Sequence, residues 1–177
     1  MRRSILALLI SFAFSSPASA SLVFSAFAVT NDTGAPQQYD LLELVAVAVP
    51  FGPPVGILGS LAIALTDTNT DGAASLSTSS AVYTALIDDT PVAQLLSDPY
   101  TLEVAVVGGS ASDSENLAPL VIPSGVLGSI GIAFDFVLSP GDSVGITAVF
   151  EVVPEPGTLL LLGTGLAGLV ATSRRLD

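Results

Sequence analysis

All four basic residues of this 177-residue chain lie at its two ends. They are Arg2, Arg3, Arg174 and Arg175. The span from Ser21 to Val153 therefore contains neither lysine nor arginine, yet it holds 14 of the 16 acidic residues, because only Glu155 and Asp177 lie outside it. Histidine is absent from the whole chain. Any carboxylate that the span buries must be hydrogen-bonded or neutralised by a metal ion, because no basic side chain can pair with it.

The missing residue types exclude several classes of function. Nucleic-acid binding needs cations that face the phosphates, and the acidic span has none. Cysteine is absent as well as histidine, which excludes Ser-His and Cys-His catalysis and the common nitrogen and sulfur metal sites. A small carboxylate-based hydrolase is the enzymatic alternative that remains. Close acid pairs are inevitable among so many carboxylates, so their presence is no evidence for a hydrolase. We therefore predict that the chain is not an enzyme and needs no cofactor.

Residues 1–20 contain the three parts of a secretion signal in the right order. A basic pair near the start is followed by an apolar run over residues 5–14 and then by Ala18-Ser19-Ala20, a small-x-small sequence. Signal peptidase reads such a pattern, so we expect cleavage after Ala20, which leaves Ser21 as the new N-terminus. The alternative, a buried N-terminal helix, does not explain why all three parts occur together.

The C-terminus has the composition of a membrane segment. Pro154 and Pro156 cannot donate backbone hydrogen bonds and end whatever strand precedes them. Residues 157–173 carry no charge, and as a helix they would be about 26 Å long, near the lower limit for crossing a bilayer. Arg174 and Arg175 would then stay on the cytoplasmic side. A helix docked on the domain is the alternative, but such a helix normally has a polar face.

The tail, residues 154–177, resembles the PEP-CTERM sorting signal of Gram-negative bacteria. The resemblance rests on the Pro-Glu-Pro sequence at Pro154, Glu155 and Pro156, the apolar segment and the closing arginine pair. It implies that a membrane-embedded exosortase recognises the motif and processes a precursor anchored in the inner membrane. It further implies a final place at the cell surface or outside the cell, linked to exopolysaccharide or biofilm. Such tails occur on proteins of many kinds, so the exported domain is not identified by it.

Residues 21–153 consist of short strand-like runs separated by turns, which predicts an antiparallel β-sandwich. Strands are predicted at 22–30, 39–49, 57–65, 81–87, 100–107, 131–138 and 144–153. The last two flank Ser-Pro-Gly-Asp-Ser, so we expect them to pair as a hairpin. The stretch from Val137 to Val153 resembles the closing hairpin of immunoglobulin-like bacterial surface domains, which implies an Ig-like sandwich.

Three segments carry more detailed predictions. Residues 39–49 are apolar on both faces, which favours a central strand. Residues 88–98 begin with Asp-Asp-Thr-Pro, where a capping residue precedes a proline at the first helical position, so one short helical turn is predicted. Residues 108–116 are rich in Gly, Ser, Asp and Asn, which predicts a loop.

One polar turn matches half of a calcium-binding loop. Asp67, Asn69 and Asp71 precede Gly72 with the spacing that supplies the first three oxygen ligands of an EF-hand. The twelfth position is Thr78 where the complete motif has a bidentate glutamate, so a full EF-hand is excluded. Two readings stay open, a plain polar turn and a weaker calcium site in a β-loop.

The sequence leads to a non-enzymatic exported protein of the cell surface or extracellular matrix. A polysaccharide- or ice-binding module is the alternative, since Thr66, Thr68 and Thr70 alternate as in the threonine ladders of some ice-binding proteins. One short row does not make an array. A broad exposed Thr/Ser or aromatic face would favour the binding module, and a featureless acidic surface would favour the matrix protein.

Overall fold

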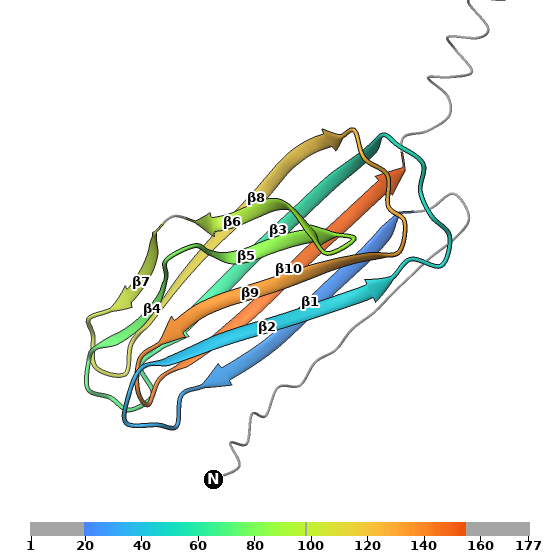
Figure 1. Cartoon of the computed structure of the whole chain (residues 1–177). Helices are drawn as coiled ribbons and strands as arrows, with labels where there is room; N and C mark the ends of the chain where they lie inside the picture. Colours follow the sequence, from blue (N-terminus) through green and yellow to red (C-terminus); the bar gives the residue numbers. More distant parts are fainter. Residues whose placement is uncertain (1–19, 98, 155–177) are drawn as a thin grey trace, which may run out of the picture.

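The computed structural model describes residues 20–97 and 99–154, and there the chain forms ten β-strands and no helix (Figure 1). The strands are β1 (Ser21–Thr30), β2 (Gln37–Ala46), β3 (Val55–Thr66), β4 (Ala74–Thr78), β5 (Ala81–Ile87), β6 (Thr90–Ser97), β7 (Tyr100–Val104), β8 (Ser110–Ile122), β9 (Ser129–Leu138) and β10 (Ser143–Pro154). No helix within the described ranges is long and apolar enough to cross a membrane. The predicted signal peptide and the predicted span 157–173 lie outside them.

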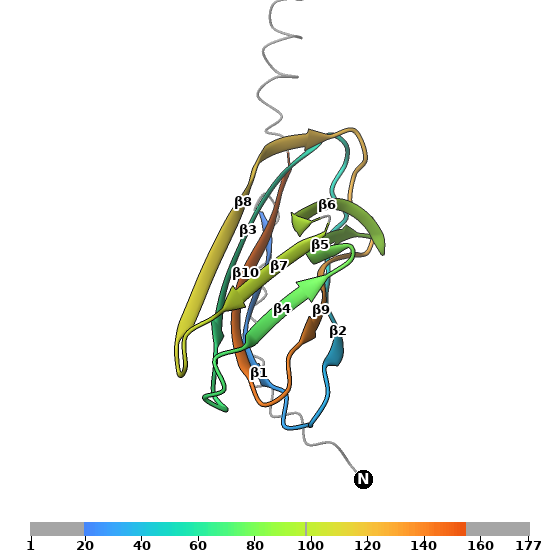
Figure 2. The ribbon, with the colours of Figure 1, turned by 90° about the vertical axis from the view of Figure 1, so that its left-hand side faces the viewer.

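The strands form two antiparallel sheets (Figures 1 and 2). The first sheet has the order β1-β10-β3-β8. In the second sheet β9 pairs with β2 on one side, and on the other side with β5 and β4, which lie end to end along it. The hairpin partner β6 lies beyond β5, and β7 lies beyond β4. The prediction of an all-β, antiparallel chain is confirmed.

The core lies between the two sheets and follows from the alternation of side chains along each strand. In β10 the even-numbered residues from Val144 to Val152 are buried, and in β9 those from Ile130 to Leu138 are buried in the same way. Aromatic rings connect the sheets: Phe27 of β1 meets Phe134 of β9 edge-on, with 5.0 Å between the ring centroids. One continuous apolar cluster results.

The predicted helical turn at 88–98 is wrong, because this segment is strand β6, paired with β5. The connection between the two strands is a tight turn at Asp88 and Asp89, whose φ angles are 48° and 61°. Positive φ at both central residues is the signature of the hairpin turn whose twist matches that of the flanking strands. Pro91 is tolerated because β6 lies at the edge of its sheet.

The Asp88 carboxylate ties this turn to a distant loop. Its Oδ2 accepts a hydrogen bond from the Leu127 amide at 2.8 Å, and its Oδ1 accepts from the amides of Gly128 and Ser129 at 2.7 and 2.9 Å. Burial alone would raise the pKa of Asp88, but these three backbone donors outweigh it and hold the pKa below its ordinary value. The ionised form of Asp88 is therefore the one that stabilises the fold.

We expect Asp88→Asn to lower the free energy of unfolding by about 1 kcal/mol at pH 7, because an amide replaces a charged acceptor that is partly exposed. The folded-state pKa lies below the unfolded one, so the stabilisation is present above the unfolded pKa and is lost as pH falls through the folded pKa. Urea unfolding of the chain without its predicted signal peptide (residues 21–177, in mild detergent) at pH 7 and pH 2 measures this. Asp89→Asn, in the same turn, is the control. Equal pH dependence in both variants would contradict the role of Asp88.

Two further predictions from local pattern are wrong. Residues 108–116 are not a loop, because all but the first two belong to β8, a 13-residue edge strand that pairs with β3. Backbone pairing outweighs the low strand propensity of Ser, Asp and Asn, and polar residues suit an exposed edge. Residues 39–49 are not a central strand, because the strand there, β2, pairs only with β9 among the described residues. Its outward-facing Leu42 and Leu44 are exposed.

The predicted hairpin between 131–138 and 144–153 is also wrong. Strands β9 and β10 belong to different sheets, so residues 139–142 carry the chain across the core edge instead of reversing it within one sheet. Asn31 fixes this corner: its Nδ2 donates to the carbonyls of Leu138 and Ser139, at 2.9 and 3.0 Å. Its backbone N–H also donates to the Asp142 carbonyl. These contacts come from a residue distant in sequence, so the turn residues alone gave no sign of them.

Candidate functional site

The two ends of the described chain lie side by side. Pro154 is the last residue of β10 and pairs with Val55, while Ser21 pairs with Val152 of the same strand. Ser21, the first residue after the predicted cleavage site, is buried, and Ala20 is half-buried. The sorting motif therefore starts where the first sheet ends. Its other predicted residues, Glu155, Pro156, Arg174 and Arg175, lie outside the described residues, as does Ala18 of the signal site.

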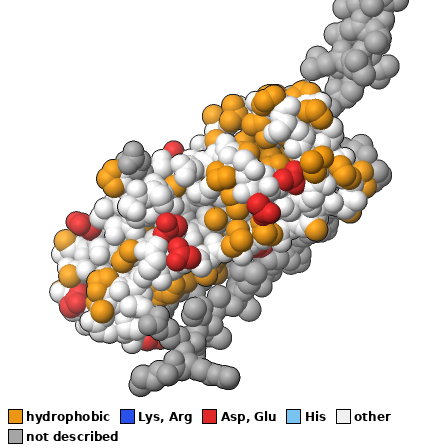
Figure 3. All heavy atoms as spheres, viewed as in Figure 1, with side chains coloured by type: hydrophobic (Ala, Val, Ile, Leu, Met, Phe, Trp, Pro, Cys, Tyr) orange, Lys and Arg blue, Asp and Glu red, His pale blue; other side chains and the backbone are white. Residues whose placement is uncertain are grey.

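Exposed apolar side chains gather at this same end of the domain (Figure 3). They come from the end of β2, the loops that follow β2 and β8, the start of β3 and the end of β8. We call this set the apolar end: Leu44, Val49, Leu58, Leu120, Val121 and Leu127. Leu127 is 76% exposed and Val121 is 57% exposed. An exposed apolar surface beside the exit of the chain is the kind of surface that contacts a membrane or a partner protein.

The predicted calcium loop is closed by its own hydrogen bonds. Asn69 Oδ1 accepts from the Asp71 amide at 3.0 Å, and Asn69 Nδ2 donates to Asp71 Oδ2 and to the carbonyl of Pro140, at 2.9 and 2.8 Å. Asp71 Oδ1 accepts from the Ala73 amide. The structure thus places Asn69 and Asp71 in an exposed, self-capped turn. Calcium binding by Asp67, Asn69 and Asp71 stays a prediction.

Asp67 differs from the other two residues because it is buried, with only 2% of its surface exposed. Its Oδ2 accepts from the amides of Gly72 and Gly108 at 2.8 and 2.9 Å. Burial would raise the pKa of Asp67, but backbone donors, those of Gly108 and Gly72 foremost, lower it below its ordinary value. Asp67 therefore acts as an ionised anchor that draws the 67–72 loop and Gly108 together.

The outer face of the first sheet has a composition that the sequence did not suggest. Three successive rows of residues cross β1, β10, β3 and β8, and none of their twelve members is larger than threonine. We call them the small-residue face: Thr30-Ser143-Thr66-Ser110, Ala28-Gly145-Ala64-Ser112 and Ala26-Thr147-Ala62-Ser114. Neighbouring strands of a sheet lie about 4.8 Å apart, and rows two residues apart repeat at about 6.8 Å. The rows therefore form a regular lattice of small side chains.

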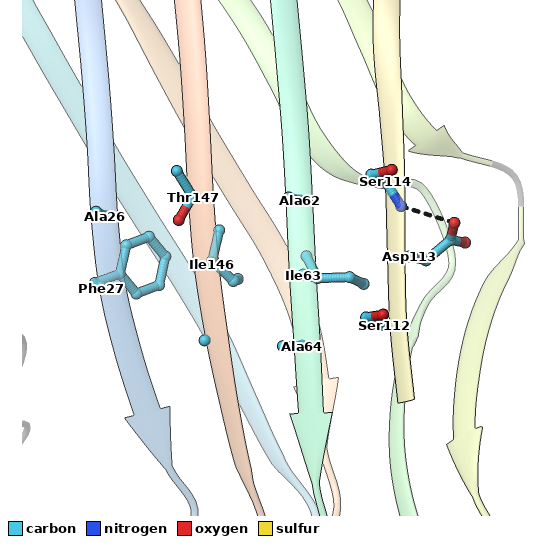
Figure 4. Close-up of a pocket in the computed structure, with 11 residues that line it drawn as sticks. Ala26, Phe27, Ala62, Ile63, Ala64, Ser112, Asp113, Ser114, Ile146 and Thr147 are labelled. Carbon is cyan, nitrogen blue, oxygen red and sulfur yellow. Dashed lines mark hydrogen bonds between the residues drawn. The ribbon is translucent and has the colours of Figure 1, made fainter. Parts of the chain in front are cut away.

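An open hollow of about 660 Å³ lies over this face (Figure 4). Ala26, Thr147, Ala62 and Ser114 lie across it in one row, one from each strand. Of the three alternating threonines noted in the sequence, only Thr66 belongs to the face, because Thr68 and Thr70 follow the end of β3. The sequence hid this surface because its four strands are far apart along the chain.

The acidic side chains of the described residues do not gather into a group of three or more that could hold a metal ion. Tyr100 is one of the few polar groups with a strongly shifted pKa: burial raises it, and the hydrogen bond from its hydroxyl to Asp113 Oδ2, at 2.9 Å, raises it further. Both residues lie near the edge of the fold, on β7 and β8. This pair accounts for the contact between those strands without implying a reaction.

Comparison with protein families identifies one feature of the chain. Residues 152–175 match the PEP-CTERM protein-sorting motif. The match begins within the last residues of β10 and covers the tail. A search of curated proteins finds no match to the chain. The motif means that the protein is exported and sorted by an exosortase, and it leaves the role of the domain before it open.

Proposed function

We propose that this exported chain is a non-enzymatic protein of the cell surface or extracellular matrix, linked to exopolysaccharide or biofilm. In this proposal the tail holds a precursor in the inner membrane until an exosortase recognises Pro154, Glu155 and Pro156 and processes the tail. The observation that carries the proposal is the sorting motif, which begins within the last strand of the two-sheet domain. We also propose that this domain is of the Ig-like sandwich class, supported by its two antiparallel sheets and single core.

The apolar end supports a precursor that stands on the membrane. Pro154 leaves the domain there, and the predicted membrane segment starts three residues later, at Gly157. A connection this short keeps Leu120, Val121 and Leu127 close to the bilayer surface while the tail is anchored. Deleting the exosortase from the host tests the sorting step. Full-length protein should then accumulate in the inner membrane, and undiminished release would contradict the proposal.

A non-enzymatic role is supported by what the carboxylates do. Asp67, Asp71 and Asp88 each accept backbone hydrogen bonds that close a turn, so they stabilise structure and are not poised as acids or bases. Glycoside hydrolysis needs two carboxyl groups on either side of a bound sugar. Asp113 is the one acidic residue among those that line the hollow over the first sheet, and its carboxylate accepts the hydrogen bond of the Tyr100 hydroxyl.

The small-residue face favours a second candidate, a module that binds polysaccharide or ice. It supplies the broad Thr/Ser surface that distinguishes this reading from a featureless acidic one. Its hydroxyl groups suit sugar hydroxyls or the water of an ice surface, and its alanines allow close approach. We expect Ala64→Lys, at the centre of the face, to abolish such binding without unfolding the protein, because Ala64 is exposed.

Co-sedimentation with the host's exopolysaccharide and measurement of ice growth with purified protein would decide this point. Gln38→Lys, an equally exposed position on β2 of the second sheet, is the matched control. If wild-type protein binds neither material, the binding module is excluded and the matrix protein stands. Binding that survives Ala64→Lys would place the binding surface elsewhere.

A further inference from the structure

The inner side of the first sheet ends in a row of buried polar residues. Asn31 follows β1, Asp67 follows β3 and Asp142 precedes β10, all at the same end of the sheet. Their exposed fractions are 0%, 2% and 1%. We call these three residues the buried polar row. They follow the apolar row Val29, Val144 and Leu65 two residues further along each strand. The core of this sheet is therefore closed at one end by two carboxylates and an amide.

Extending the register of β3 and β10 by one residue places Asp67 opposite Asp142. In the β3–β10 register Thr66 pairs with Ser143, and two contacts show that the same register continues past this pair. Thr68 Oγ1 donates to the Gly141 carbonyl at 2.7 Å, and Asn69 Nδ2 donates to the Pro140 carbonyl at 2.8 Å. Directly opposite residues of antiparallel strands have Cβ atoms about 5 Å apart. The two carboxylates are thus neighbours on the core side.

Each of the two carboxylates has one oxygen bonded and one oxygen that forms no hydrogen bond. The Oδ2 of Asp67 accepts from two amides, and the Oδ2 of Asp142 accepts from the Ser139 hydroxyl. The Oδ1 atoms of both are fully buried and form no hydrogen bond within residues 20–97 and 99–154, although the amides of Thr70 and Asp71 also act on the Asp67 carboxylate. A buried oxygen left without a partner costs free energy, and two such oxygens on adjacent anions cost more because the charges repel.

The protein cannot neutralise this pair with a side chain of its own acidic span. No lysine, arginine or histidine occurs anywhere between Ser21 and Val153. Protonation is one way to remove the charge, but the backbone donors on Asp67 favour its ionised form. A cation from solution is the other way, and it would satisfy both Oδ1 atoms at once.

We propose that a calcium ion binds between Asp67 and Asp142, bridging their two Oδ1 atoms. Calcium takes oxygen ligands at about 2.3–2.6 Å, a range that two carboxylates on opposite strands can span around one ion. Two carboxylates neutralise its charge. The Ser139 hydroxyl, which contacts Asp142, is a third oxygen at the site, and water or backbone carbonyls supply the rest of the six to eight ligands. This site shares Asp67 with the loop predicted from sequence but uses neither Asn69 nor Asp71.

Calcium titrations of the chain from Ser21 to Asp177, in mild detergent at constant ionic strength, test the proposal. Saturating calcium should raise the melting temperature by about 5–10 °C at a hundred times the dissociation constant. Magnesium should have a much smaller effect, because it demands a tighter octahedral site. Asp67→Asn and Asp142→Asn should each weaken calcium binding at least tenfold, measured by calorimetry.

Asp71→Asn is the matched control, because it removes a carboxylate from the sequence-predicted loop but leaves the proposed pair intact. It should bind calcium as the wild-type chain does. If Asp142→Asn does not fold, the control alone still decides: retained binding of one ion supports the pair, and lost binding assigns calcium to the 67–71 loop and overturns the proposal. Absence of any calcium-dependent shift in the wild-type chain overturns it as well.

Discussion

Replacing Pro154, Glu155 and Pro156 with alanine should abolish release of the protein and leave the uncleaved chain in the inner membrane. The three residues begin at the last paired residue of β10, Pro154, and lead to the predicted membrane segment, and they are the predicted recognition residues of the sorting motif. Alanine removes both prolines and the carboxylate but leaves the apolar segment and the arginine pair, so the predicted anchor remains. Immunoblots of the inner membrane and the medium measure the distribution.

The control for this substitution is Asp32→Ala combined with Pro36→Ala. It removes one carboxylate and one proline from an exposed loop at the opposite end of the domain. We expect this variant to be released as the wild type is. Normal release of the Pro-Glu-Pro variant would sink the sorting function of the motif, whereas retention of both variants would point to misfolding.

Asn31→Ala should lower the free energy of unfolding by about 3 kcal/mol, a large share of the stability of a domain this size. The Asn31 side chain donates to the buried carbonyls of Leu138 and Ser139, and alanine removes both hydrogen bonds. Its Oδ1 also accepts from the amide and the hydroxyl of Thr33. Urea unfolding of residues 21–177 in mild detergent, followed by circular dichroism, gives the change.

Asn116→Ala is the matched control for this loss. Asn116 is exposed on the edge strand β8, and we expect its replacement to change the free energy of unfolding by less than about 0.5 kcal/mol. A similar small change for Asn31→Ala would mean that the corner between β9 and β10 is held by other contacts. The comparison separates the buried role of the amide from the general effect of removing an asparagine.

Strands were predicted best where one face of the strand is buried, because burial alone then sets the pattern of apolar residues. β10 and β9 alternate so regularly between Val144 and Val152, and between Ile130 and Leu138, that both strands were predicted nearly to their ends. Burial on one face imposes a period of two, and that period is visible in the chain itself. The sorting tail was equally legible, because a processing enzyme must read it as a linear sequence.

The wrong predictions concern segments whose structure is decided by a partner. β8 contains Ser, Asp and Asn and becomes a strand because β3 offers it a paired edge. β6 begins with a helix-capping pattern, but Asp88 accepts three amides from the 127–129 segment, and this contact fixes a hairpin turn instead. The turn before β10 crosses between sheets because Asn31 holds it. None of these partners is close in sequence.

The candidate sites show the same limit. The small-residue face needs the register of four strands before its rows exist, and no single strand among them is unusual. Asp142 drew no attention in the sequence, since a Pro-Gly-Asp turn explains an aspartate without further assumptions. Only the burial of Asp142 and its place opposite Asp67 in the register mark it as a candidate metal ligand.

The pairing of β1 with β10 constrains the order in which the protein can fold and be processed. The first strand to be synthesised and exported has its partner at the very end of the domain, and β2 likewise depends on β9. Neither N-terminal strand can complete its sheet until β9 and β10 are present, so their apolar faces stay uncovered until almost the whole domain has been made. A tail that starts at Pro154 is available for processing only after β10 has emerged. Processing of the tail therefore cannot precede the arrival of the last strand of the domain.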